Sequence, residues 1–489
     1  MSGMNKHIYL ESRRCLRRGW YARNLPDDGK LGDADQFFVN QGTEIGILAH
    51  RLYPDGVLVE WTGLLDTVNQ TRRLMEDPSV SVIFEATFHI GGYTTRADVL
   101  VRNGDGWRVV EVKSSLFDPE VEDKLIDDVC YTVMVARQCG INVNAASLLQ
   151  LRPDFRRGMG GEQMFGEADL TAVVQDRMSL FSSQWSRIRE ATAQPVCPLE
   201  VSSGRACLDC PYYAGHCFGK GLEHPVRELP RIGDKISAFL DAGILDLRDT
   251  PGDFPLELND QQYTVLECAR SEKPYVAPGL KAALDVVRWP AYYLDFETVQ
   301  TALPLYPDIA PYAQMVTQYS IHRCPAVGKV DAHHEYLADP QRDCQREVAQ
   351  SLITDLGTEG SIIVYSPFES SRIGELAERL PDLAEPLLAI RARLFDLLQV
   401  VREHYYHPAF HGSYSIKTVL PVLVPEMSYS GLAIADGGAA MTVFARAAMG
   451  QYSPTEWAEI RKNLLTYCGQ DTMAMVQLHR VLFGLCCKF

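Results

Sequence analysis

The chain has 489 residues, a formal net charge of -16 at pH 7, 46% hydrophobic residues and 22% charged residues. Because this length exceeds what one hydrophobic core usually accommodates, we expect two or three folded domains. The negative charge excludes a protein coated with basic surface, although a local basic groove remains compatible with it. The sequence contains no run of about 18 apolar residues, and it therefore predicts no membrane span.

The thirteen cysteines are an odd number, and the first residues, MSGMNKHIYLESRRC, contain no apolar signal core. We therefore expect a cytoplasmic protein, in which disulfides are rare and clustered cysteines are interpreted first as metal ligands. One such cluster stands out, formed by Cys207, Cys210 and Cys217, with Cys197 just upstream.

Three strand-like runs follow one another between residues 79 and 115: SVSVIFEATFHI, TTRADVLVRN and WRVVEVKSS. Glycine-containing turn signals at 91–92 and 103–106 separate them. A helical stretch, DPEVEDKLIDDVCYTVMVARQCG, ends at Gly140 and is followed by a further apolar run, AASLLQL. This succession of helix, three strands, helix and strand predicts an α/β fold with a mixed sheet.

The middle of the chain is polar and contains prolines around 193–230, and residues 231–290 predict small helices. Apolar, strand-like sequence resumes at WPAYYLDFETV and continues with AQMVTQYSIHR and SIIVYS, after which helices dominate. The last helix begins at a capping box that starts at Ser453 and has proline at the first helical position. We expect a first domain over 1–222, a short helical spacer over 223–286 and a second domain over 287–489.

Two carboxylates and a lysine lie on two of the predicted strands in the first domain. Asp98 is in TTRADVLVRN, and Glu111 and Lys113 are in WRVVEVKSS. Residues i and i+2 of a strand point to one face, so Glu111 and Lys113 project together, and Asp98 on the paired strand can join them. Two carboxylates bind a hard cation such as Mg²⁺, and a lysine orients water or neutralises developing phosphate charge. The pattern alone leaves open an exposed ion pair at a sheet edge.

With this trio in place, residues 1–220 resemble the RecB-like exonucleases of the PD-(D/E)XK superfamily, including the iron–sulfur type. The family pattern is a G-x-x-x-H helix, an aspartate and E-x-K, and the matching residues are Gly46, His50, Asp98, Glu111 and Lys113. The resemblance implies a restriction-endonuclease-like mixed sheet with flanking helices, Mg²⁺ or Mn²⁺ as cofactor, and His50 as a further metal or water contact. The family's Q-x-x-x-Y helix has no glutamine counterpart here, and Tyr131 is the nearest candidate.

The same resemblance implies a [4Fe–4S] cluster held by Cys15 near the start of the chain and by Cys207, Cys210 and Cys217. From the C-x-x-C spacing alone, thiolates suit iron–sulfur and zinc equally. Cys197 is an alternative to Cys15 in a local zinc site with four cysteines. In either case the cluster would join the two ends of the domain.

A second carboxylate constellation lies in the last two hundred residues. Asp295 and Glu297 share one face of the apolar run YYLDFETV, and Tyr467 and Asp471, four residues apart, share one face of the last helix. Between them in the sequence stand Glu369 and Asp396. Four carboxylates around two metal ions, with a tyrosine that orients water, suit in-line cleavage of a phosphodiester. The pattern alone also fits a helix–sheet scaffold with solvated carboxylates.

This part of the chain resembles the RNase H-like DEDD 3′–5′ exonucleases of the tyrosine-bearing subclass. In particular, it is similar to the uncharacterised RNase H-like domain that bacteria fuse behind RecB-like nucleases. The resemblance implies an RNase H-like α/β domain that binds metal through Asp295, Glu297 and Asp471, with Tyr467 orienting water. Ser366 and Glu369 stand where the family usually has asparagine and aspartate. Asp396 occupies a place where the family's aspartate is often structural, so Glu369 is the fourth predicted ligand.

Together these resemblances predict a metal-dependent nuclease that hydrolyses DNA, as single strands or from ends, in repair, recombination or defence. A basic cluster near the start is a candidate for gripping a strand, although a solvated helix face fits it as well. Its arginines and the nearby aromatic residues are Arg13, Arg14, Arg17, Arg18, Trp20 and Tyr21. The alternatives are an RNA-directed exonuclease and a nucleic-acid-binding scaffold in which one or both sites have decayed.

Overall fold

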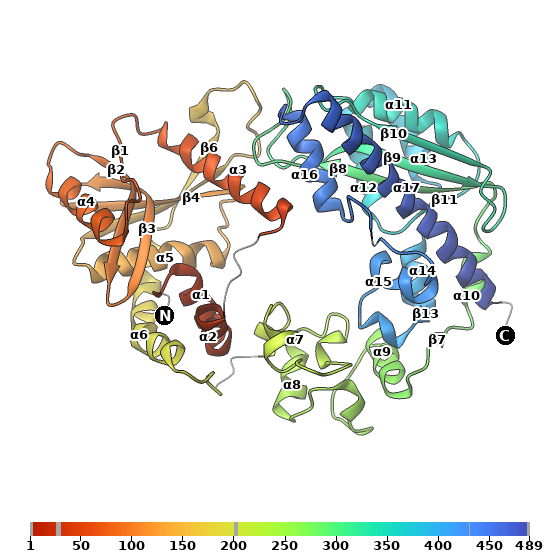
Figure 1. Cartoon of the computed structure of the whole chain (residues 1–489), viewed down its shortest axis with the longest axis horizontal. Coiled ribbons are helices and arrows are strands. Elements are labelled where there is room, and N and C mark those ends of the chain that lie inside the picture. Colours follow the sequence, from red (N-terminus) through yellow and green to blue (C-terminus); the bar gives the residue numbers. More distant parts are fainter. Residues whose placement is uncertain (1–2, 26–30, 200–203, 430, 487–489) are drawn as a thin grey trace. The chain divides into compact units, whose positions relative to one another are not determined.

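The computed structural model describes residues 3–25, 31–199, 204–429 and 431–486 (Figure 1). The chain divides into two compact units, Met1–Tyr213 with Thr301–Ala313 and Ala214–Gln300 with Gln314–Phe489. Each unit contains a mixed sheet with helices packed on it, which confirms the predicted α/β class. The predicted spacer, 223–286, lies within the second unit.

The sheet of the first unit contains six strands in sequence order. Strands β2, β3 and β4 form an antiparallel meander, and β5 then joins β4 in parallel. These four strands are the four apolar runs identified in the sequence, while the short β1 and β6 extend the two edges. Their bounds are Val57–Leu58 (β1), Val82–Ile90 (β2), Tyr93–Asn103 (β3), Gly106–Leu116 (β4), Val143–Leu151 (β5) and Phe165–Asp169 (β6).

Helices cover both faces of this sheet. On one face, α1, α5 and α6 share a hydrophobic cluster that includes Tyr9, Val109 and Phe181. On the other face, α3 packs through Ile45 and Ala49 against a separate cluster. The helix bounds are Lys6–Arg14 (α1), Leu16–Asn24 (α2), Asp33–His50 (α3), Leu64–Glu76 (α4), Asp123–Gln138 (α5) and Thr171–Ala193 (α6).

The segment Thr301–Ala313 belongs to the first unit although it follows the first strand of the second sheet. Ala302 is buried in the α3 cluster beside Phe84 and Val99. Its backbone N–H donates to Oε1 of Gln41 at 2.6 Å, and the guanidinium of Arg157 donates to the carbonyl of Leu305. The first unit is therefore completed by residues that lie far along the chain.

The sheet of the second unit contains five strands in the order β10-β9-β8-β11-β12. The central strand β8 pairs antiparallel with β9 and parallel with β11. The three runs that the sequence marked as strands are β8, β9 and β11, whereas β10 and β12 extend the edges. Their bounds are Ala291–Val299 (β8), Met315–Cys324 (β9), Ala332–Leu337 (β10), Ile362–Val364 (β11) and Leu394–Asp396 (β12).

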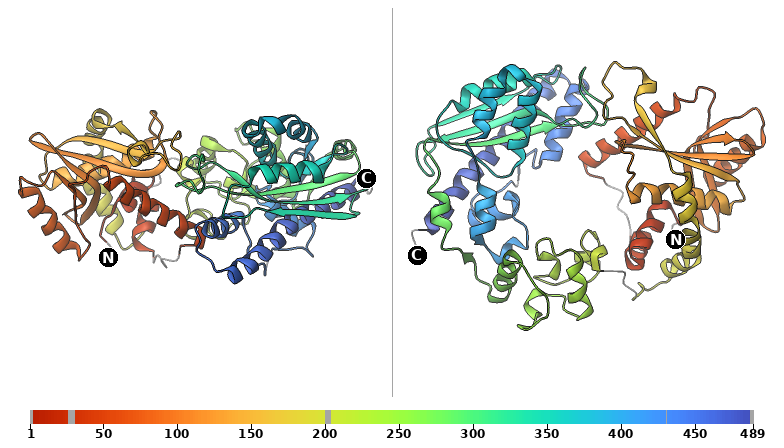
Figure 2. Two further views of the ribbon diagram at one scale, coloured as in Figure 1. Left: turned by 90° about the horizontal axis from the view of Figure 1, so that it is seen from above. Right: turned by 180° about the vertical axis from the view of Figure 1, so that it is seen from behind.

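The second sheet also has helices on both faces (Figure 2), with α11, α12 and α13 on one side and α16 and α17 on the other. The last of these, α17, begins at the predicted capping box, in which Ser453 and Glu456 cap each other's backbone. The bounds of these helices and of two neighbours are Gln345–Leu356 (α11), Phe368–Arg379 (α12), Ala384–Arg391 (α13), Leu397–His404 (α14), Ile416–Leu423 (α15), Gly437–Ala448 (α16) and Pro454–Leu485 (α17).

Shorter elements lead from residue 213 into the second sheet. They include the helices α7 (Tyr213–His216), α8 (Ile236–Asp241), α9 (Asp260–Ser271) and α10 (Leu280–Leu284). A two-stranded ribbon of β7 (Tyr275–Val276) and β13 (Tyr405–Tyr406) joins this region to the C-terminal helices. Within the described ranges, no helix combines the length and the apolar character needed to cross a membrane.

Candidate active sites

Glu111 and Lys113 project from β4 toward α1 and α5. Oε1 of Glu111 accepts hydrogen bonds from Nζ of Lys113 at 3.1 Å and from Nζ of Lys6, on α1, at 2.6 Å. Lys113 also pairs with Asp128 on α5. The Glu111 side chain is 4% exposed, and burial opposes its ionisation, yet the two ammonium groups lower its pKa. Glu111 is thus a buried carboxylate held ionised between two lysines.

Asp98 lies opposite Glu111 in the register of β3 and β4, because the next pair along the two strands is Val99 with Val110. One of its oxygens, Oδ2, accepts the backbone N–H of Val112 at 2.7 Å. Burial, together with the negative charge of Glu111, raises the pKa of Asp98 to about 7. The structure therefore brings together the three residues of the predicted trio, Asp98, Glu111 and Lys113.

Glu85 on β2 is a further acidic residue at this place. The pairs on either side of it, Phe84 with Val99 and Ala86 with Ala97, put Glu85 opposite Asp98. Its φ of 59° interrupts the strand, its carboxylate pairs with Arg96 at 3.1 Å, and burial raises its pKa. In the sequence its only signal is a lone charge inside an apolar run, VIFEATF.

Lys6 and Asp128 were also missed. Nζ of Lys6 is 3.8 Å from Oδ2 of Asp128, so the two lysines and the two carboxylates form one network. Burial opposes protonation of Lys113, but Glu111 and Asp128 raise its pKa. No motif in the sequence marks Lys6, because it reaches the sheet from a helix more than a hundred residues away.

His50 and Tyr131 do not contact the trio by any hydrogen bond or ion pair between these described residues. His50 is the last residue of α3, and its ring stacks on Phe84 with centroids 3.9 Å apart. Burial lowers its pKa, which favours the neutral imidazole. The hydroxyl of Tyr131 instead donates inside the core, to the carbonyls of Thr94 at 3.0 Å and Met4 at 3.2 Å.

The basic cluster near the start of the chain is largely paired within the protein. Arg13 pairs with Asp127 at 3.1 Å, Arg14 pairs with Asp209, and Arg18 pairs with both Glu11 and Asp209. Nε1 of Trp20 donates to the carbonyl of Gln194 at 2.7 Å, and Tyr21 is buried. These contacts tie α1 and α2 to α5, α6 and residues near the cysteines.

Cys15 separates α1 from α2 and is buried, as is Cys207. Burial raises the pKa of the Cys210 thiol, and the neighbouring Cys15 contributes in the same direction. Cys217 belongs to the second unit. Within the described part of the chain, the two sets of three or more potential metal ligands whose ligand atoms lie within 4.8 Å of one another contain no cysteine.

The second constellation is one of those two sets. Ligand oxygens of Asp295, Glu297 and Asp471 all lie within 4.8 Å of one another. The first two project from the central strand β8, and Asp471 projects from the middle of α17, which packs across β8 and β9. Although Asp471 lies 176 residues after Asp295, the strand and the helix thus bring three carboxylates to one point.

Mutual repulsion and burial dominate the electrostatics of this cluster. Burial, reinforced by Asp471 and Glu297, raises the pKa of Asp295 well above its usual range. Burial and Asp471 raise the pKa of Glu297 to about 8. Carboxylates that repel one another in a partly dry site are stabilised by a multivalent cation, and oxygen ligands are those that Mg²⁺ and Mn²⁺ prefer. The donor set therefore fits a hard divalent cation.

Glu369 is buried at the start of α12 and contributes to the negative potential felt by Asp295 and Glu297. Its Oε2 accepts a hydrogen bond from Ser366 at 3.2 Å, and burial raises its pKa to about 7. Asp396 has a different role, because Oδ1 caps α14 by accepting the N–H groups of Leu398 at 2.9 Å and Gln399 at 3.4 Å.

Two tyrosines and a lysine surround Asp471. Its Oδ1 accepts a hydrogen bond from the hydroxyl of Tyr429 at 2.5 Å, and Tyr467 also lowers the pKa of this carboxyl group. Nζ of Lys417, on α15, lies 5.6 Å from the ring centroids of both tyrosines, and its charge lowers the pKa of Glu297 and Asp471. Lys417 and Tyr429 are site residues that no spacing in the sequence indicated.

Residues 292–415 match the family described as a domain of unknown function (DUF2779). An uncharacterized protein of Ureaplasma parvum is 27% identical over 208 residues, which cover 38% of this chain and 30% of the relative. One of Mycoplasma genitalium is 26% identical over 239 residues, which cover 45% of this chain and 35% of the relative. The matched regions thus span about a third of these curated relatives. No solved structure matches the chain.

Proposed function

We propose that the chain is a metal-dependent nuclease that hydrolyses phosphodiester bonds of DNA. The observation that carries the proposal is the convergence of Asp295, Glu297 and Asp471, whose ligand oxygens lie within 4.8 Å of one another. A set of acidic side chains with raised pKa values, next to one lysine, is suited to a divalent cation and a phosphate group. The DEDD-type resemblance of this part of the chain supports the same reading.

A divalent cation bound there would supply Lewis-acid polarisation of the phosphate and a more acidic water. The protein's own groups have separate tasks. Asp471 is held in position by Tyr429, and Tyr467 presents its hydroxyl beside the same carboxylate. Lys417 brings a positive charge that attracts the phosphate and partly offsets the charges of Glu297 and Asp471.

The RecB-like trio is the second site of the proposal. Asp98 and Glu111 offer oxygens, and Lys113 offers an ammonium group beside them, as the resemblance implies. A cation at this place has to compete with Lys6 and Lys113 for Oε1 of Glu111. The proposal also includes a [4Fe–4S] cluster, or zinc, on Cys15, Cys207, Cys210 and Cys217. A cytoplasmic location is part of it, since reduced cysteines suit such a cluster.

The test uses the full chain purified without oxygen and end-labelled single-stranded DNA, duplex DNA and RNA, each with Mg²⁺ or Mn²⁺. We expect DNA to be degraded, and Asp295→Asn to lower the rate of its site at least about 100-fold. Lys113→Ala tests the other site in the same way, and the double variant should be inactive.

Two matched variants serve as controls. Lys124 stands in a chance E-x-K on α5, where it is exposed and pairs with Glu122, so Lys124→Ala should keep full activity. Glu335 is an exposed acid on β10, and Glu335→Gln should do the same. Cleavage of RNA alone would assign the activity to RNA, and activity untouched by both Asp295→Asn and Lys113→Ala would contradict the proposed sites.

A further inference from the structure

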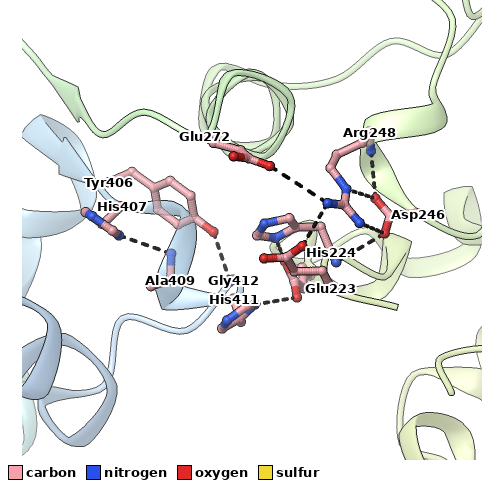
Figure 3. Close-up of polar contacts among 11 residues, drawn as sticks. Glu223, His224, Asp246, Arg248, Glu272, Tyr406, His407, Ala409, His411 and Gly412 are labelled. Atoms are coloured by element: carbon pink, nitrogen blue, oxygen red, sulfur yellow. Dashed lines mark hydrogen bonds and ion pairs between the residues drawn. The ribbon is translucent and has the colours of Figure 1, made fainter. Parts of the chain in front are cut away.

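A second group of potential metal ligands lies in the second unit, away from the carboxylate cluster. It consists of His224, Glu228 and His411, whose ligand atoms lie within 4.8 Å of one another. Figure 3 labels the two histidines. Glu228 ends the short 3-10 helix Val226–Glu228, and His224 lies just before that helix. His411 follows the short helix 408–410, 183 residues beyond Glu228. Neither resemblance found in the sequence involves these three residues.

The two histidines contact the two oxygens of the Glu228 carboxylate. Nδ1 of His224 lies 3.0 Å from Oε2 of Glu228, and Nδ1 of His411 lies 3.0 Å from Oε1. The two imidazole rings lie side by side, with centroids 5.3 Å apart and an interplanar angle of 26°. In a tetrahedral zinc site with bonds of about 2.0–2.2 Å, neighbouring ligand atoms are about 3.3–3.5 Å apart. Small side-chain movements are therefore enough for the three residues to share a cation.

Burial and charge favour a cation at this place. His224 and Glu228 are 3% and 8% exposed, whereas the His411 side chain is half exposed. Three further acidic residues lie around them: Asp246, Glu223 and Glu272. Each forms an ion pair with Arg248, at 3.0, 2.8 and 3.9 Å respectively. Three carboxylates thus share one guanidinium, while Glu228 pairs with the two histidines instead. The four carboxylates outnumber this one guanidinium, which leaves a local negative charge.

The backbone holds the two segments in this arrangement. Gly412 has φ +77°, and a Cβ there would lie 2.1 Å from the carbonyl oxygen of Glu228. The N–H of Gly412 donates to the hydroxyl of Tyr406 at 3.0 Å, and His411 itself has a left-handed φ of 47°. Asp246 accepts the backbone N–H of His224 at 3.3 Å. The positions of the ligands are thus set by contacts that do not depend on a metal.

We propose that His224, Glu228 and His411 bind a zinc ion, with both imidazoles and the carboxylate as ligands and water at the fourth position. Two imidazoles with one carboxylate are typical zinc ligands and poor ligands for Mg²⁺. The exposed side of His411 leaves room for the water. Binding displaces the protons that otherwise join the histidines to Glu228. This ion is distinct from the hard cation of the proposed nuclease site in both ligands and location.

The zinc fastens the loop after β13 to the turn at 224–228. That loop continues through Ser413 into α15, which carries Lys417 beside the carboxylate cluster. The ion therefore stabilises the segment that orients a residue of the proposed nuclease site, without contacting the substrate.

The full chain is stripped of metal with EDTA and transferred into millimolar Mg²⁺. Zinc is then titrated in competition with a chromophoric zinc chelator, which measures the number of zinc ions bound per chain. We expect wild type to bind one more zinc ion per chain than either Glu228→Gln or His411→Ala. Any zinc bound by the cysteines is the same in all three proteins and cancels in the comparison. Glu228→Gln preserves volume, and His411→Ala alters an exposed side chain, so both metal-free variants should keep the circular dichroism spectrum of wild type.

His407 supplies a matched control in the same loop. Its Nδ1 accepts the N–H of Ala409 at 3.1 Å, so His407→Asn keeps a cap and should keep the full zinc stoichiometry. Cobalt(II) should give visible bands of a four-coordinate site that His411→Ala removes. Equal zinc binding by wild type, Glu228→Gln and His411→Ala would overturn the proposal, whether or not the nuclease activity is present.

Discussion

The carboxyl groups of Asp295 and Glu297 illustrate how single residues set the energetics of this protein. Each is held near other acids in a site that water only partly reaches, and each therefore keeps its proton to a higher pH than it would in the unfolded chain. Asp98 behaves similarly beside Glu111, although two lysines offset the charge there. The acids of the second site thus have less compensation than those of the first.

This difference makes the stability of the metal-free protein depend on pH. Glu297 has a pKa of about 8 in the folded chain and about 4.5 when unfolded. Between these values the folded state binds more protons, so the free energy of unfolding falls as the pH rises. Glu297→Gln removes that titration. We expect the variant to be more stable than wild type by on the order of 1–3 kcal/mol at pH 8.5, and about equal near pH 4.5.

Urea unfolding in EDTA at several pH values measures this difference, and Glu335→Gln on the exposed face of β10 should follow wild type throughout. Adding Mg²⁺ at pH 8.5 should stabilise wild type more than Glu297→Gln. Parallel pH profiles for wild type and Glu297→Gln would contradict the raised pKa.

At the scale of elements, one strand and two helices bring the acidic side chains to the second site. β8 presents Asp295 and Glu297, α17 presents Tyr467 and Asp471, and α12 presents Glu369. Asp396 instead ends β12 and caps α14. Aspartate therefore joins the carboxylate cluster in one element and caps a helix backbone in another.

The capping role of Asp396 has a direct consequence for mutation. Asparagine caps a helix about as well as aspartate. Asp396→Asn should therefore leave the free energy of unfolding nearly unchanged and keep the rate of DNA cleavage within about twofold of wild type. Glu369→Gln keeps the shape of its side chain but removes a charge from the carboxylate cluster. We expect it to lower the rate of DNA cleavage about 10–100-fold, as loss of groups near a metal commonly does.

Cleavage assays at saturating Mg²⁺, together with urea unfolding, separate the two roles. Asp396→Ala, which removes the cap, should cost about 1 kcal/mol of stability. A large loss of activity in a stably folded Asp396→Asn variant would make Asp396 a site residue.

At the scale of the whole molecule, the first unit is not continuous in sequence. Ala302 fills part of its α3 cluster, and the backbone of 301–313 bonds to Gln41 and Arg157. A fragment that stops at residue 222 exposes the apolar surface that Ala302 covers and leaves the Oε1 atom of Gln41 without this donor.

We expect a fragment of residues 1–222 to melt several degrees below the same unit in the full chain, because a buried hydrogen bond and apolar burial are lost. Hydrogen exchange of β2, β3 and β4 in the fragment and the full chain measures the difference for this unit alone. A peptide covering 298–316 should restore part of the protection, whereas a scrambled peptide should not. Equal protection in the fragment and the full chain would show that 301–313 is dispensable.

Several elements were predictable because local patterns specify them. The alternating runs around Asp98 and Glu111 form β3 and β4, the run around Asp295 forms β8, and Ser453 starts the last helix. The α/β class follows from this succession of elements. The edge strands β1, β6, β10 and β12 were not identified, because short edge strands are specified by pairing more than by local sequence.

The sequence by itself determined the α/β class, the main strands and the side chains that the site residues carry, because periodicity and turn signals act over a few residues. Only the tertiary structure decided which of those side chains meet. In the folded protein Lys6 and Asp128 pair with Glu111 and Lys113. Asp396 caps a helix, and His224, Glu228 and His411 lie together. These contacts span tens to hundreds of residues, and packing of whole helices and sheets, rather than spacing along the chain, brings their atoms together.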